Sequence, residues 1–155
     1  METLVLGLGN PILSDDGVGI KVAHEVANQF NSPQVTIAET STAGLSLLDS
    51  IVGYDKVIII DAVQTREGHA GQIYRMGLQD FSSAKHFSSP HQINLVTALE
   101  LGKMLDLAIP QEITIFAVEA EDVSNFSERC TPEVERAIPE AVKMVLEELK
   151  CQTSS

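Results

Sequence analysis

Two consecutive carboxylates near the N-terminus are the first candidates for chemistry. Asp15 and Asp16 follow the segment Gly-Leu-Gly-Asn-Pro at residues 7–11 and precede Gly17 and Gly19. One aspartate at a helix start is explained by capping of free backbone N–H groups, worth about 0.5–2 kcal/mol. Two in succession exceed that need, and a glycine inside a helix costs about 1 kcal/mol relative to alanine. We therefore assign helix capping to Asp15 and a functional role to Asp16. We also expect another group to approach the backbone of Gly17 and Gly19 closely.

A strand that passes through glycines into a helix also suggests a dinucleotide-binding site. The G-x-G-x-x-G pattern would require glycine at position 12, which is Ile12. The two aspartates would also repel a pyrophosphate placed at the helix start. The segment is therefore not expected to bind a dinucleotide.

Two further residues could complete a site with Asp16. Asp61 directly follows the continuously apolar run 57–60, and open α/β sheets bind ligands at the carboxyl ends of their strands. If this strand neighbours the first, Asp61 faces the same crevice as Asp16; capping of a turn is the alternative. His91 follows a serine and a proline that are typical of a helix start, where the positive helix end keeps the imidazole neutral. Two carboxylates and one imidazole would form a metal site with open positions, although most lone histidines are not ligands.

Nucleophilic alternatives find less support. The segment around Ser46 lacks the second glycine of a nucleophile elbow. Cys130 and Cys151 form no CxxC pair, which excludes a cysteine zinc site and a disulfide scaffold and fits a reducing compartment. A hydrolytic or metal-binding role therefore rests on the carboxylates and the histidine.

The elements that would position these residues alternate between strands and helices. Short apolar runs predict strands at residues 4–8, 35–39, 57–60, 72–76 and 113–118, and helical spacing predicts helices at 15–30, 45–51, 92–105 and from 131 onward. Only about ten residues separate the third and fourth strands, too few for a parallel crossover, so the fourth should be antiparallel at an edge. Pro139 predicts a kink or a restart in the last helix. The whole predicts a three-layer α/β fold, with a mixed, mostly parallel, five-stranded twisted sheet and helices on both faces.

Composition limits the partners and the compartment. The chain has 155 residues and a formal net charge of -12, which opposes nucleic acid and favours a neutral or basic substrate surface. No apolar run reaches the ~20 residues of a membrane helix, and no basic segment precedes the first strand, as a signal peptide would require. We expect one domain at residues 1–150 with a short tail at 151–155, located in the cytoplasm and away from membranes.

Several motifs, taken in order, resemble the family of hydrogenase maturation endopeptidases. The similarity runs from Leu4 to about Leu149. Its motifs are Gly7-x-Gly9-Asn10, Asp15-Asp16-Gly17-x-Gly19, Thr42-Ala43-Gly44, Ile60-Asp61-Ala62, Ser89-Pro90-His91 and Thr131-Pro132-Glu133-Val134. The resemblance implies a protease that removes a C-terminal extension from the large subunit of a nickel–iron hydrogenase after nickel insertion. It implies no resident cofactor, with the nickel supplied by the hydrogenase large-subunit precursor.

The resemblance also implies roles for individual residues. Asp16, Asp61 and His91 would contact the metal, and the two aspartates would be catalytic. Nickel would act as a Lewis acid in the reaction. Alternatively, it would serve only for recognition of the substrate, with an aspartate as general base. Similar sequences often carry aspartate in place of Glu39, a departure that affects the shape of the cleft. The candidate residues of the substrate cleft are Asn10, Glu39 and Gly44.

Two alternatives remain from the sequence. Peptidyl-tRNA hydrolases also begin with a strand and Gly-Leu-Gly-Asn-Pro, which makes esterase action on tRNA one of them. Such enzymes continue to a histidine, whereas here no histidine precedes His24, and the charge of -12 opposes tRNA. The other is a non-enzymatic nickel-binding chaperone that uses the same three ligands but cleaves nothing.

Overall fold

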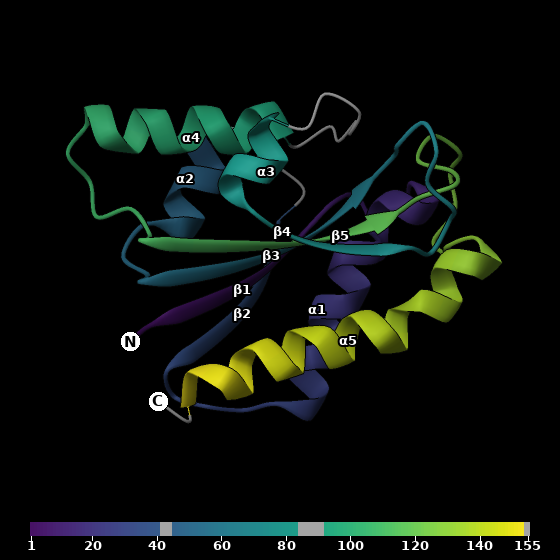
Figure 1. Ribbon diagram of the computed structural model, residues 1–155, viewed down its shortest axis with the longest axis horizontal. Helices are drawn as coiled ribbons and strands as arrows, with labels where there is room; N and C mark the ends of the chain where they lie inside the picture. Colours follow the sequence, from purple (N-terminus) through teal and green to yellow (C-terminus); the bar gives the residue numbers. More distant parts are fainter. Residues whose placement is uncertain (41–44, 84–91, 154–155) are drawn as a thin grey trace.

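The fold is known from a computed structural model, which describes residues 1–40, 45–83 and 92–153. Figure 1 shows a twisted sheet between two layers of helices. The elements, in chain order, are β1 (Thr3–Leu8), the 3-10 helix η1 (Ser14–Gly17), α1 (Val18–Gln29), β2 (Val35–Thr40), α2 (Leu45–Ile51), β3 (Lys56–Val63), β4 (Ile73–Gly77), α3 (Leu78–Ser83), α4 (Gln92–Met104), β5 (Glu112–Glu119) and α5 (Pro132–Thr153).

The five strands form a single sheet in the order β2-β1-β3-β5-β4. β1 pairs in parallel with β2 and β3, and β3 pairs in parallel with β5. β4 is antiparallel to β5 at the edge, as its short connection predicted. Because the chain leaves β1 toward β2 and later returns on the other side as β3, the strand order reverses between β1 and β3. That reversal places a crevice at their carboxyl ends.

Alternating side chains divide the core into two layers, one on each face of the sheet. Val5, Ile58 and Ile60 pack with α1 and α5 on one face. Leu6 and Ile59 pack with α2 and α4 on the other. The predicted central strand is confirmed, since every residue of β3 is buried. A strand covered on both faces has no water-facing side, which explains its unbroken apolar run at residues 57–60.

Two details differ from the sequence-based prediction. The helix expected over 15–30 is preceded by the separate 3-10 turn η1, and α1 begins only at Val18. The short helix α3 lacked an apolar period and was not predicted. At Pro139 the sequence predicted a kink or a restart; α5 is one continuous helix from Pro132 to Thr153, so no restart occurs there. Within the residues that the structure describes, no helix is long and apolar enough to cross a membrane.

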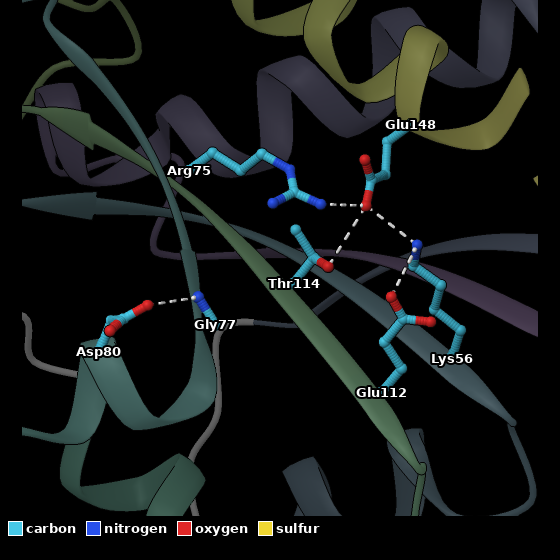
Figure 2. Close-up of polar contacts among 7 residues, drawn as sticks. All are labelled: Lys56, Arg75, Gly77, Asp80, Glu112, Thr114 and Glu148. Carbon is cyan, nitrogen blue, oxygen red and sulfur yellow. Dashed lines mark hydrogen bonds and ion pairs between the residues drawn. The ribbon is translucent and has the colours of Figure 1, made fainter. Parts of the chain in front are cut away.

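A partly buried ion-pair network links α5 to the sheet at the end opposite the crevice (Figure 2). Lys56, at the start of β3, is 3% exposed, and its Nζ lies 2.9 Å from Glu148 Oε1 of α5. Arg75 of β4 reaches the same oxygen at 2.8 Å. Burial raises the pKa of Glu148, but hydrogen bonds from Arg75 and Lys56 outweigh it and hold that pKa below its usual value. The network compensates the charge of a lysine that would otherwise be costly to bury.

Candidate functional site

The loop after β1 folds back on itself around Asp16. The Asp16 side chain is almost buried, and its Oδ2 accepts a 2.9 Å hydrogen bond from the Asn10 N–H. Asn10 in turn accepts from the Ile12 N–H with its side chain at 3.1 Å and from the Leu13 N–H with its carbonyl at 3.1 Å. Asn10, a candidate for the substrate cleft, therefore shapes the loop that holds Asp16.

The glycines of this segment are explained by contacts within the chain. A Cβ on Gly19 would overlap the carbonyl oxygens of Ile60 and Leu8, and a Cβ on Gly9, whose φ is +143°, would overlap the carbonyl of Asp16. The expected close approach is therefore made by other parts of the same chain, and at Gly19 by the ends of two strands. It lets the start of α1 rest directly on the ends of β1 and β3, which brings the Asp16 loop to the crevice.

Asp61 lies near the carboxyl end of β3 and is completely buried. It alternates with Ile59 and Val63, which pack on the α2 and α4 face, so its side chain belongs to that face. Its Oδ1 accepts a 2.9 Å hydrogen bond from the Ala62 N–H. η1 contacts β3, so the structure brings the loop of Asp16 and the strand of Asp61 to the same edge, as the sequence predicted.

Two of the predicted site residues, His91 and Gly44, lie outside the described residues. α4 begins immediately after position 91, at Gln92, and its Leu95 packs in the same apolar cluster as Val63. The described start of α4 is therefore on the face to which Asp61 belongs. Within residues 1–40, 45–83 and 92–153, no group of three His, Cys, Asp or Glu side chains could hold a metal ion.

Glu39 is placed away from Asp61. In β2 it is paired in register with Gly7, on the face covered by α1, whereas Asp61 belongs to the opposite face. Its carboxylate contacts His24 Nε2 of α1. The structure therefore places Glu39 and Asp61 on opposite faces of the sheet.

Asp15 has a different partner from the one expected. Among the described residues, no side chain makes a capping hydrogen bond to η1 or α1, so the prediction that Asp15 caps this helix is wrong. Asp15 is completely buried, and its Oδ2 accepts from the Glu121 N–H (2.9 Å), the Asp122 N–H (3.0 Å) and the Thr131 hydroxyl (2.8 Å). Its Oδ1 accepts from the Thr131 N–H at 2.7 Å. One carboxylate thus fastens the β5–α5 loop to the loop that carries Asp16.

Glu119 is a further buried carboxylate at this edge, and the sequence analysis missed it. Glu119, the last residue of β5, is paired in register with Val63 and is 2% exposed. It accepts from the Thr65 N–H (2.8 Å), the Thr65 hydroxyl (2.6 Å) and the Tyr74 hydroxyl (2.9 Å). A pocket of about 430 Å³ lies over this group, lined by Thr65, Arg66, Glu67, Gly68, Gln72 and Tyr74. Like Asp61, Glu119 ends an apolar run, and that was the available signal.

Known proteins share this arrangement over nearly the whole chain. The sequence profile described as hydrogenase maturation protease matches residues 20–148. The hydrogenase 2 maturation protease of Escherichia coli strain K12 is 30% identical over 154 residues, spanning 97% of this chain and 92% of that protein.

Solved structures agree with the sequence comparison. The hydrogenase maturating endopeptidase of Escherichia coli superposes with a TM-score of 0.84 at 28% identity, covering 98% of this chain and 94% of that one. A hydrogenase 2 maturation peptidase from a Thaumarchaeota archaeon gives 0.70 at 29% identity, covering 96% and 98%.

The family match excludes the tRNA esterase and chaperone alternatives, because both the matched profile and these relatives are peptidases. The chain belongs to the hydrogenase maturation protease family, and it is an endopeptidase that cleaves the C-terminus of a hydrogenase large subunit.

Proposed function

We propose that Asp16 and Asp61, together with His91, contact nickel that is carried by the large-subunit precursor. The nickel arrives with the substrate, and the enzyme holds no metal of its own. The observation that supports the proposal is that η1, which carries Asp16, contacts β3, which carries Asp61, and that both carboxylates are buried near the point where the strand order reverses.

Burial explains why a cation suits this crevice. An ionised carboxylate removed from water is costly unless donors or a cation compensate its charge. Asp16 and Asp61 are both almost inaccessible, and each accepts a backbone hydrogen bond. A nickel ion entering with the substrate would add the positive charge that such a site favours. A neutral imidazole, as proposed for His91, would offer a lone pair to the same ion.

The carboxylates also supply the proton acceptor that hydrolysis needs. Water attacks the scissile carbonyl carbon, one aspartate takes the proton from that water, and the proton then passes to the leaving amine as the C–N bond breaks. Removal of the C-terminal extension releases the mature large subunit. We place this step in the cytoplasm, in keeping with the cysteine usage of the sequence.

The test compares nickel-loaded and nickel-free forms of the unprocessed large subunit. The wild-type protein should shorten the nickel-loaded form, seen as a mobility shift and a mass loss, and leave the nickel-free form intact. His91→Ala should lose this discrimination together with most of the cleavage. Equal cleavage of the two precursor forms would refute the role of nickel, while a fully active His91→Ala would remove that residue from the site.

A further inference from the structure

An aromatic side chain stands in solvent beside the loop that carries Asp16. Phe126, in the β5–α5 loop, is 83% exposed, and Ile12, between Asn10 and Asp16, is 47% exposed. We call these two residues the Ile12–Phe126 patch. A phenylalanine so exposed gains nothing for folding, because apolar burial is what stabilises the folded chain.

Backbone hydrogen bonds hold the two halves of the patch together. The Ser127 N–H donates to the Ile12 carbonyl at 2.9 Å, and the Ser14 N–H donates to the Ser127 carbonyl at 2.9 Å. Leu13 and Ser127 form a parallel bridge, so Ile12 and Phe126 occupy the positions just before the two bridge partners. The patch therefore sits on a backbone that is fixed to the Asp16 loop.

The turn that leads to Phe126 is also braced. Asp122 Oδ1 accepts from the Ser124 N–H (3.0 Å) and the Asn125 N–H (3.1 Å), and Asp122 Oδ2 accepts from the Asn125 side chain (2.6 Å). Asp15 anchors the start of the same loop through the Glu121 and Asp122 N–H groups. An aromatic ring on a pre-ordered backbone loses little entropy on binding, which is the usual property of an interface anchor.

We propose that the Ile12–Phe126 patch is a docking surface for the folded large-subunit precursor, seated beside the segment that is cut. The proposal rests on the proposed function, because it takes Asp16 to be part of the catalytic site. The position of the patch beside the catalytic site identifies what binds there. Ile12 is four residues from Asp16 on the same hydrogen-bonded loop, so a protein surface on the patch would belong to the substrate. Apolar contacts also suit an enzyme of net charge -12, because they attract a protein surface without requiring it to be strongly basic.

The chain offers a matched control at the opposite edge of the sheet. Met104, at the end of α4, is 81% exposed, and the segment after it leads to the beginning of β5, far from the carboxyl ends of the strands. A general effect of removing exposed apolar surface would appear equally at Met104 and Phe126. A docking effect would appear at Phe126 alone.

The experiment measures cleavage of nickel-loaded precursor by Phe126→Ala, Phe126→Leu and Met104→Ala. We expect Phe126→Ala to raise KM about tenfold, as for a truncated interface anchor, and to leave kcat within about twofold of wild type. Phe126→Leu should restore much of the affinity, and Met104→Ala should match wild type. All three should melt at the wild-type temperature, since the changed side chains are exposed.

Several outcomes would overturn the docking surface. They are an unchanged KM for Phe126→Ala, an equal rise in KM for Met104→Ala, and a loss confined to kcat, which would mean that Phe126 acts on the catalytic loop instead. Each leaves the peptidase activity of the wild-type protein intact. If the wild-type protein does not distinguish nickel-loaded from nickel-free precursor, the proposed function fails instead. Failure of the docking surface and failure of the proposed function therefore give different results.

Discussion

Asp15→Ala should destabilise the protein strongly, because this buried carboxylate accepts hydrogen bonds from four partly buried donors. Three backbone N–H groups and one hydroxyl donate to it at 2.7–3.0 Å. A buried donor left without an acceptor costs about 1–3 kcal/mol. These donors are partly buried, so water returns part of that cost, and the loss of the buried charge returns more. We expect the free energy of unfolding to fall by about 3–5 kcal/mol.

The isosteric change Asp15→Asn should cost less, because only one acceptor oxygen becomes a donor. With the remaining oxygen at the Oδ2 position, three hydrogen bonds survive and the new amide faces the Thr131 N–H. A loss of about 2 kcal/mol is expected. For a protein of this length, each kcal/mol lowers the melting temperature by roughly 2–4 °C, so the two variants should be clearly separated in thermal and urea unfolding.

Asp16→Ala provides the contrast. It removes one accepted backbone hydrogen bond and one buried charge, so its stability should stay within about 1 kcal/mol of wild type. Below its melting transition, Asp15→Ala should retain more processing activity than Asp16→Ala. An Asp15→Ala protein as stable as wild type would refute the fastening role. An inactive Asp15→Ala beside a normally active Asp16→Ala would mean that the two roles are reversed.

Three further results are expected. Gly19→Ala should lower the free energy of unfolding by about 3 kcal/mol in urea titrations, because its Cβ overlaps the Ile60 carbonyl. The pKa of Glu148 is depressed in the folded state. Its contribution to stability is therefore present above its unfolded pKa and is lost as pH falls through its folded pKa. The difference in unfolding free energy between wild type and Glu148→Gln should shrink on acidification. Purified protein treated with chelator should contain well under one nickel per chain by elemental analysis, because the proposed ligands include no thiolate and leave coordination positions open.

The main elements, and the ends of the strands on which Asp16 and Asp61 lie, could be predicted from local patterns in the sequence. The unbroken apolar run at residues 57–60 indicated a strand buried on both faces, and the short connection to residues 72–76 indicated an antiparallel edge strand. Both are confirmed. Placing Asp61 at the end of that strand and Asp16 after the first then required only that the two strands be neighbours, which they are.

The remaining features depend on contacts between distant segments. Asp15 is bound by residues more than a hundred positions away, and a local pattern reports only that an acid stands near a helix start. Gly19 is required by the carbonyls of two strands, which a sequence cannot distinguish from the approach of a ligand. The exposure of Phe126 likewise depends on how the β5–α5 loop is fastened.

The most direct test of the account is cleavage of nickel-loaded precursor by Asp16→Asn and Asp61→Asn, with Asp106→Asn as the matched control. Asp106 is exposed after α4 and has a φ of 57°, a conformation that asparagine adopts readily. The change to asparagine keeps the shape of each side chain and removes its charge and basicity. We predict that both site variants cleave at least about a hundredfold more slowly than wild type and that the control cleaves normally. Wild-type rates from either Asp16→Asn or Asp61→Asn would contradict the assignment of that carboxylate to the reaction.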